Sequence, residues 1–223
     1  MGNSEPTTTF DTLSEDPALQ PRLAPRPVDT LGDAHRAVHE GIVTSVRKVG
    51  EMSNGALPGP FNAWMYVSPT LTRALDGLGV AIRTETGAVP PVLKEIAVCV
   101  VAAHRRCNVA FWAHARIASK VGVPPALIED LRQERIPAFA DLPGASAQDQ
   151  HTVWQFVRSY LALHRVDDAL YDAVRTALGS DEAMVQLVLV IGHYCNIAAQ
   201  LNLLRVPAPG AEQPFPPLPP ADR

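Results

Sequence analysis

The sequence has few cysteines, few aromatic residues and no excess of basic charge. Its 223 residues include only 3 cysteines, at positions without paired spacing, so a disulfide scaffold is excluded and a reduced, cytoplasmic protein is expected. Lysine and arginine number 19 against 23 acidic residues, which gives a formal net charge of −4. Nucleic acid is therefore not an expected partner.

Long apolar runs are also missing. The longest is Ile96–Ala103, far shorter than the ~20 residues that a membrane-spanning helix needs. The first residues carry acidic side chains and no apolar stretch, so they do not resemble a secretory signal, and Pro6 stands where myristoylation needs Ser or Thr. We expect no membrane partner. Hydrophobic residues make up 47% of the chain, which is enough for one sizeable core.

Prolines are concentrated at the two ends of the chain. Proline fixes the backbone and removes a hydrogen-bond donor, so proline-rich segments disfavour helices. This distribution predicts a proline-rich N-terminal arm over 1–29, a helical domain over 30–206 and a proline-rich C-terminal tail over 207–223.

The region between the arms is predicted to be all-α. Apolar residues recur there at helical spacing, and no segment alternates as a half-buried strand does. The final helix is the most apolar, so we expect it to be central. The expected helices span 34–49, 69–83, about 90–104, 107–120, a short segment from 125, 148–164, 168–178 and 181–205.

Three side chains in the most apolar stretch could carry chemistry. Glu95 interrupts a hydrophobic helix, where a charged group needs a partner. Cys107 is predicted at a helix start after Arg105 and Arg106, a setting that can lower a thiol pKa. His114 follows two helical turns later on the same face, and histidine with a carboxylate is a common general acid–base pair.

These residues lie within a longer pattern. It comprises the GPFNAW segment, Glu95, the AHARIASKVGVP segment and the IGHYCNIAAQLN segment. From Pro58 to Pro209 the chain resembles the carboxymuconolactone decarboxylase / alkyl hydroperoxidase D superfamily. The resemblance implies an AhpD-like helical bundle that forms a dimer, trimer or hexamer. An oligomer also agrees with the sequence, because two helices are apolar over much of their circumference.

The redox branch of this superfamily has a glutamate, a Cys-x-x-Cys pair that begins twelve residues later, and a histidine four residues beyond. Glu95, Cys107 and His114 match that spacing, but Ala110 replaces the second cysteine. A peroxidase cycle that closes an internal disulfide cannot run within this motif. The resemblance therefore favours the decarboxylase branch, a cofactor-free carbon–carbon lyase that acts on a small carboxylated or cyclic molecule.

In this hypothesis His114 is the general acid–base, Glu95 orients it and Cys107 is a polar group of the pocket. Arg105 or Arg106 would bind a substrate carboxylate. Two alternatives stay open: a single-cysteine thiol peroxidase in which an external thiol resolves Cys107, and a non-catalytic oligomer that binds a small ligand.

Other polar and aromatic residues are weaker candidates for the pocket. The predicted substrate-binding set adds Trp64, Trp112, His193, Tyr194 and Asn196. Each has a plain structural alternative in core packing or a local hydrogen bond, Cys107 could be a small buried hydrophobe, and Glu95 could pair with Lys94 or Arg105.

Recognisable cofactor motifs are missing. His104, Cys107 and His114 do not have zinc-ligand spacing, and there is no phosphate loop, dinucleotide fingerprint or G-x-S-x-G motif. We expect no metal and no cofactor.

Overall fold

The computed structural model describes residues 20–210 and 213–216, and the chain divides into two compact units. Unit 1 comprises Met1–Val80 with Gln200–Arg223, and unit 2 comprises Ala81–Ala199. Most of the predicted arm over 1–29 and much of the predicted tail over 207–223 lie outside the described residues. Each unit is described separately below.

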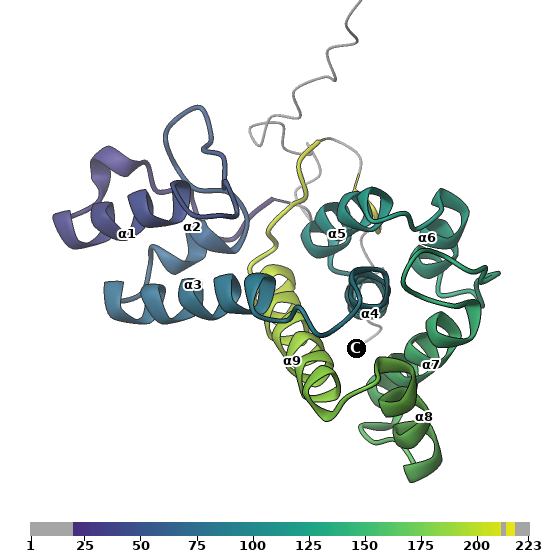
Figure 1. Cartoon of the computed structure of the whole chain (residues 1–223). Helices are drawn as coiled ribbons and strands as arrows, with labels where there is room; N and C mark the ends of the chain where they lie inside the picture. Colours follow the sequence, from purple (N-terminus) through teal and green to yellow (C-terminus); the bar gives the residue numbers. More distant parts are fainter. Residues whose placement is uncertain (1–19, 211–212, 217–223) are drawn as a thin grey trace, which may run out of the picture. The chain divides into compact units, whose positions relative to one another are not determined.

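The described part of unit 1 contains a 3-10 turn and three helices (Figure 1): Val28–Thr30, then α1 (Asp33–Val43), α2 (Pro60–Trp64) and α3 (Pro69–Thr84), whose last turn belongs to unit 2. α1 ends earlier than the predicted 34–49. The Thr44 hydroxyl donates to the Glu40 carbonyl oxygen, and Lys48 takes a left-handed backbone conformation with φ 49°, which a helix cannot contain.

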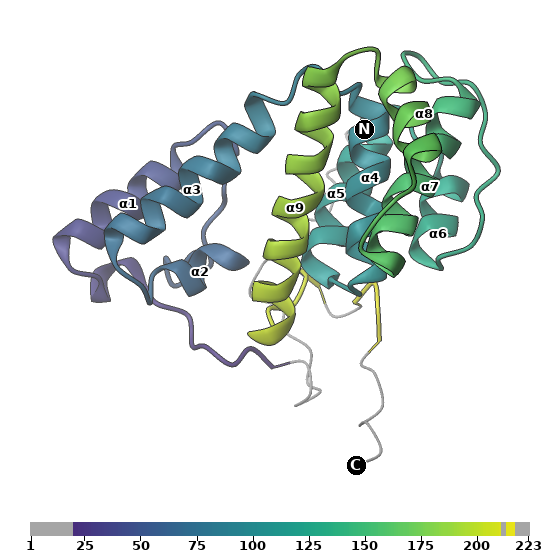
Figure 2. The same cartoon turned by 90° about the horizontal axis from the view of Figure 1, so that it is seen from below.

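Unit 2 contains the remaining helices: α4 (Pro91–His104), α5 (Asn108–Lys120), α6 (Pro125–Arg132), α7 (Ala147–Leu163), α8 (Asp168–Leu178) and α9 (Asp181–Leu203), which ends in unit 1. Figure 1 looks along α4, with α5, α6 and α7 around it, and Figure 2 shows the same helices from the side. Every residue from Val92 to Ala103 except Lys94 is buried. α4 is therefore the central helix of this unit.

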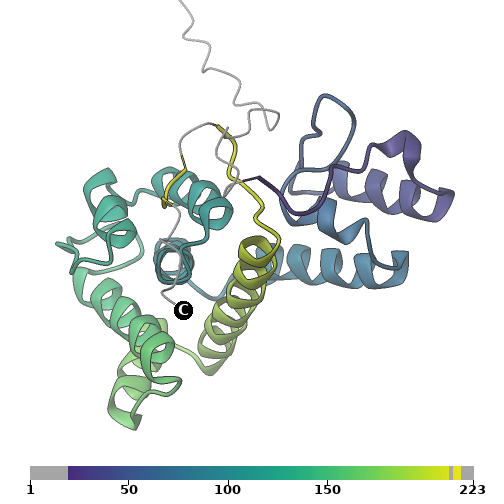
Figure 3. The ribbon, with the colours of Figure 1, turned by 180° about the vertical axis from the view of Figure 1, so that it is seen from behind.

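Local sequence signals explain where these helices begin and end. Pro91 and Pro125 stand in the first turns of α4 and α6, where proline costs no hydrogen bond. Ser146 and Asp149 form a reciprocal capping box that starts α7. Gly179 ends α8 in the left-handed conformation, with φ 78°, and lets the chain turn into α9; Figure 3 shows this turn from behind.

The predicted all-α fold class is confirmed. The described residues form helices, with a single isolated β-bridge between Leu142 and Ala145. The predicted helix from 69, the starts near 91, 108 and 125, and the helices over 148–164 and 168–178 agree with the structure to within two residues.

The expectation that the final helix is central is wrong. Val185, Val188 and Leu189 on α9 are 58%, 49% and 54% exposed, whereas Leu187 and Val190 are buried. Among the described helices α9 alone is long and apolar enough to cross a membrane by length and composition. A core helix of a water-soluble protein passes the same test, so this finding is weak support for a membrane span.

Candidate active site

The turn between α4 and α5 determines which residues of the two helices meet. The Cys107 backbone N–H donates to the Ala102 carbonyl oxygen across this turn, at 2.8 Å. Arg106, between them, takes a left-handed conformation with φ 48°. This is the Schellman type of helix ending, in which the chain leaves one helix and reverses. α5 therefore returns alongside α4, and residues far apart in sequence come together.

Glu95 on α4 and His114 on α5 form a hydrogen-bonded pair. The His114 Nδ1 and Glu95 Oε2 atoms are 2.7 Å apart, and both side chains are nearly buried, with 12% and 8% of their surfaces exposed. Burying a carboxylate is costly unless it is paired, so the imidazole stabilises Glu95 in this apolar helix. With Nδ1 donating to the carboxylate, Nε2 is the nitrogen available for proton exchange with a ligand.

An aromatic contact fixes the imidazole from another direction. The ring of Tyr194 on α9 meets the His114 ring edge to face, with 4.6 Å between the ring centroids and an angle of 78° between the planes. Such pairs contribute roughly 0.5–1.5 kcal/mol beyond burial. The hydrogen bond and the ring contact together restrict the orientation of His114.

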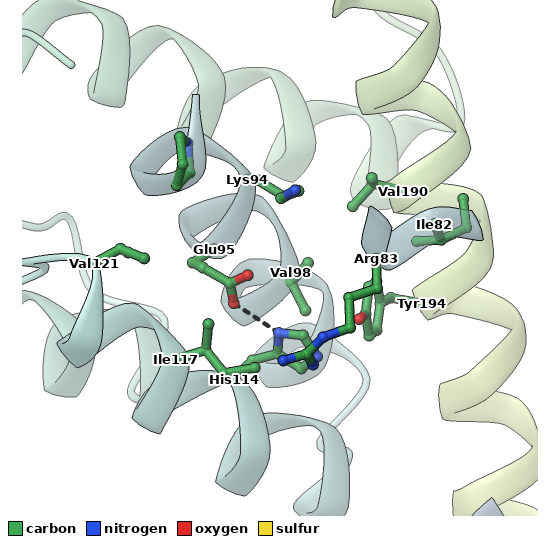
Figure 4. Close-up of a pocket in the computed structure, with 11 residues that line it drawn as sticks. Ile82, Arg83, Lys94, Glu95, Val98, His114, Ile117, Val121, Val190 and Tyr194 are labelled. Carbon is green, nitrogen blue, oxygen red and sulfur yellow. Dashed lines mark hydrogen bonds and ion pairs between the residues drawn. The ribbon is translucent and has the colours of Figure 1, made fainter. Parts of the chain in front are cut away.

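These groups line a pocket of about 210 Å³ that lies within unit 2 (Figure 4). Its walls are mostly aliphatic, from Ile82, Val98, Ile117, Val121 and Val190. Its polar lining consists of Arg83, Lys94, Glu95, His114 and Tyr194. The volume is below the roughly 300–1,000 Å³ of sites for drug-sized ligands, so the pocket fits a small molecule.

The two cations of this pocket were not predicted. Arg83 stands in the last turn of α3 and Lys94 immediately precedes Glu95. The sequence alternative in which Lys94 pairs with Glu95 is wrong, because the Lys94 ammonium donates to the Thr86 hydroxyl at 3.2 Å. The position of Lys94 directly before Glu95 could have identified it from the sequence as a pocket residue. No sequence feature near Arg83 indicates a place in the pocket, because only the fold brings the last turn of α3 there.

Cys107 does not match its predicted role. It is the N-cap of α5 and fully buried, and it is not among the residues that line the pocket. Burial raises its pKa to about 11, although the backbone N–H groups of Ala110 and Val109 oppose that shift. The expectation that Arg105 and Arg106 lower this pKa is therefore wrong: desolvation is the largest effect, and the opposing effect comes from backbone N–H groups.

The other thiols offer no better nucleophile. Cys99 is fully buried on α4, and burial together with the charge of Glu95 raises its pKa far above the ordinary range. Cys195 is partly exposed on α9 and does not line the pocket.

Most of the remaining predicted site residues also lie away from the pocket lining. Arg105 is exposed and Arg106 sits in the α4–α5 turn, so neither supplies the predicted carboxylate contact there. His193 packs its ring against Tyr194 at 5.2 Å, and Asn196 is exposed. Of the predicted substrate-binding set, only Tyr194 lines this pocket.

The two tryptophans proposed from the sequence have local partners. The Arg116 guanidinium lies 4.1 Å from the centroid of the Trp112 ring on the same helix. Trp64 belongs to unit 1, where its indole N–H donates to the Gln200 side-chain oxygen at 2.8 Å. Across the described ranges, no group of three or more His, Cys, Asp or Glu side chains could hold a metal ion.

Comparison with known proteins gives matches in structure but not in sequence. No protein-family model matches the chain, and no curated protein sequence matches it. A protein from Ralstonia eutropha JMP134, described as an alkylhydroperoxidase AhpD core and uncharacterized peroxidase-related protein, superposes with a TM-score of 0.65 at 17% identity, over 84% of this chain and 92% of that one. The chain has the AhpD-like fold.

Two further solved structures superpose on this chain over most of its length. An uncharacterized peroxidase-related protein from Silicibacter sp. TM1040 has a TM-score of 0.64 at 15% identity, over 88% of this chain and 94% of its own. The debrominase Bmp8, solved as a cysteine-to-alanine variant with 2,3,4-tribromopyrrole, has a TM-score of 0.60 at 15% identity, over 89% and 95%. The resemblance noted in the sequence is thus confirmed at the level of the AhpD-like fold.

Proposed function

We propose that this protein is an enzyme that moves protons to and from a small organic molecule, with His114 as general acid–base and Glu95 as its orienting partner. The observation that carries the proposal is the 2.7 Å hydrogen bond between Glu95 and His114 on the wall of an otherwise aliphatic pocket. A positioned acid–base group of this kind contributes roughly 10²–10⁴ in rate.

The reaction class we favour is a carbon–carbon lyase of the decarboxylase type, without a cofactor. The bond between the carboxyl carbon and its neighbour breaks, carbon dioxide leaves, and the electron pair stays on the substrate carbon. The imidazolium of His114 then gives that carbon a proton from Nε2, while Glu95 stabilises the charged ring. Solvent returns the proton for the next turnover.

A panel of small unsaturated, cyclic and β-keto carboxylic acids tests this proposal. Carbon dioxide release and deuterium incorporation from D₂O would be followed for the wild type, for His114→Gln and for the exposed control variant His164→Gln. We expect turnover of at least one acid, lost in His114→Gln and retained in the control. A folded His114→Gln protein with full turnover would contradict the role of the imidazole.

A thiol peroxidase is the second candidate, because two proteins with this fold are described as peroxidase-related. In that function the Cys107 thiolate attacks one oxygen of a peroxide, the O–O bond breaks, and an alcohol or water leaves. An external dithiol then reduces the resulting sulfenic acid to the thiol, with release of water, and is itself oxidised to a disulfide. The burial of Cys107 and its raised pKa argue against it. Peroxide-dependent dithiol oxidation that is abolished by Cys107→Ala would replace the lyase proposal with this one.

A pocket that only binds a ligand is the third candidate. It is distinguished by a ligand-dependent rise in melting temperature without turnover of any panel member.

A further inference from the structure

The pocket contains two cations and only one carboxylate, which is already engaged. Glu95 accepts the hydrogen bond from His114. Within residues 20–210 and 213–216, neither Arg83 nor Lys94 takes part in an ion pair, whereas Arg132 pairs with Glu129. Unpaired positive charge around a pocket with aliphatic walls favours an anion that enters it.

Lys94 is held at the pocket rather than free on the surface. Its ammonium donates to the Thr86 hydroxyl at 3.2 Å and to the Thr86 carbonyl oxygen at 3.4 Å. The Thr86 hydroxyl in turn donates to the Ile82 carbonyl oxygen at 2.7 Å, and Thr86 is buried. An ammonium has three donors, and two long contacts to neutral oxygens leave its charge uncompensated.

Arg83 adds a second cation beside the same space. Figure 4 shows Arg83, Lys94, Glu95 and His114 around the pocket, with Val98 and Val190 among them. A guanidinium can hold a carboxylate or phosphate through two parallel hydrogen bonds, and an ammonium adds a point charge. The aliphatic residues then face the uncharged part of the same ligand.

We propose that Arg83 and Lys94 form an anion subsite that selects small organic acids, with the acid's apolar part against Ile82, Val98 and Val190. That such an acid is the substrate of the enzyme rests on the proposed function. That the pocket binds small organic acids does not depend on it. The role that the sequence suggested for Arg105 and Arg106 thereby passes to two other residues. Neutral ligands of the same size are expected to bind less tightly, because they cannot accept charge-assisted hydrogen bonds from the exposed Arg83 and the half-buried Lys94, and cationic ligands are repelled by both.

Three aromatic probes of nearly equal size test the sign of charge that the pocket accepts: benzoate, the neutral benzamide and the cationic benzylamine. Binding would be measured by calorimetry and by melting temperature at constant ionic strength, in a buffer without multivalent anions. We expect benzoate to bind at least about tenfold more tightly than benzamide, since hydrogen bonds to charged groups are roughly twice as strong as neutral ones. Equal binding of benzoate and benzamide would overturn the subsite.

Two charge-removing variants locate the anion. Arg83→Gln and Lys94→Gln should each weaken benzoate binding about tenfold and leave benzamide binding unchanged. Because Lys94 also donates to Thr86, the melting temperature of each variant without ligand checks that the fold is kept. Arg73→Gln, on the exposed part of α3, and Lys120→Gln, at the end of α5, are the matched controls. Wild-type benzoate affinity in both pocket variants would refute the assignment.

The same probes separate this inference from the proposed enzyme activity. Benzoate binding needs no turnover, so it can be measured in His114→Gln. If Arg83→Gln and Lys94→Gln lose benzoate but no acid of the substrate panel reacts, the subsite stands and the catalytic proposal fails. If acids of the panel react but benzoate binds equally well to the wild type, Arg83→Gln and Lys94→Gln, the subsite is refuted and the catalytic proposal stands. Inorganic phosphate as a fourth probe shows whether the bare anion suffices or the apolar part is required.

Discussion

Glu95 and His114, nineteen positions apart in the sequence, share a 2.7 Å hydrogen bond because the α4–α5 turn reverses the chain and places α5 alongside α4. The carboxylate fixes which imidazole nitrogen carries the proton, and the imidazole N–H gives the carboxylate a hydrogen-bond donor within an apolar helix. The hydrogen bond between Glu95 and His114 therefore both stabilises a buried carboxylate and sets the proton position on the imidazole.

Glu95→Gln tests this pair. Glutamine has the same shape and its carbonyl oxygen can still accept from Nδ1, so the fold should survive, but the negative charge that stabilises an imidazolium is lost. We expect turnover to fall at least tenfold, and by roughly 10²–10⁴ in His114→Gln, where the acid–base group itself is missing. Rates on a reactive panel acid measure the effect, and circular dichroism checks the fold. The exposed Glu40→Gln is the control, and unchanged turnover in Glu95→Gln would remove Glu95 from the mechanism.

Tyr194 is expected to position His114 through its ring. Tyr194→Phe keeps the ring contact and removes only the hydroxyl, whereas Tyr194→Leu removes the aromatic face. We predict nearly unchanged turnover in the phenylalanine variant and a several-fold lower kcat in the leucine variant, because an aromatic pair contributes roughly 0.5–1.5 kcal/mol to holding the ring. The imidazole signals of His114 in NMR should broaden in the leucine variant alone. A large loss in Tyr194→Phe would instead indicate a chemical role for the hydroxyl.

Much of the fold could be predicted from the sequence. Proline at helix starts, glycine after helix ends and apolar periodicity located most helices of unit 2, since these signals act within one or two turns of the chain. The match of Glu95 and His114 to the spacing of the superfamily motif identified the two residues that the structure joins by a hydrogen bond. The predicted homo-oligomer and cytoplasmic location stay predictions.

Long-range properties could not be predicted in the same way. Arg83 reaches the pocket only through the path of α3, and the pKa of Cys107 depends on how completely its neighbours exclude water. The backbone N–H groups at the helix start are a local feature that lowers this pKa, and burial outweighs them. The central place of α4, by contrast, agrees with composition: α4 is the more apolar of the two helices per residue, and α9 leaves Val185, Val188 and Leu189 exposed.

The buried thiols predict an unusual pH dependence of alkylation. Burial raises the pKa of Cys107 to about 11, so its iodoacetamide reaction should be negligible at pH 7 and rise about tenfold per pH unit up to that value. Cys195, which is partly exposed, should react first. Peptide mass spectrometry after timed labelling from pH 7 to 11 measures each site. Fast labelling of Cys107 at pH 7 would show an activated thiolate and favour the peroxidase candidate.

The same raised pKa has a consequence for stability. The folded state holds the Cys107 proton more tightly than the unfolded state, whose thiol titrates near 8.5. The raised pKa therefore contributes to the free energy of unfolding. The contribution is fully present below about pH 8.5, where the thiol is protonated in both states, and it is lost as the pH rises toward 11. Cys107→Ala should flatten the decline in stability over that interval, as seen in urea unfolding at pH 8, 9 and 10. An identical decline in wild type and variant would contradict the shift.

A separate prediction concerns unit 1, where Arg47 and Asp76 form an ion pair with 12% and 19% of their side-chain surfaces exposed. The Arg47 guanidinium also lies 4.8 Å from the centroid of the Phe61 ring. Removing one member of a largely buried pair leaves an uncompensated charge, so Asp76→Asn should destabilise unit 1 by roughly 3 kcal/mol. Hydrogen exchange of amides in α1 and α3 measures that loss directly.

Replacing both members distinguishes charge from packing. The double variant Arg47→Met, Asp76→Leu leaves no unpaired charge, so it should recover much of the stability that Asp76→Asn loses. Asp33→Asn is the matched control, because the Asp33–Arg36 pair is exposed and such pairs contribute only about 0–1 kcal/mol. If Asp76→Asn is as mild as Asp33→Asn, water reaches the pair freely and its burial does not determine the stability of unit 1. If the double variant is as unstable as Asp76→Asn, the shape of the two side chains matters more than their charge.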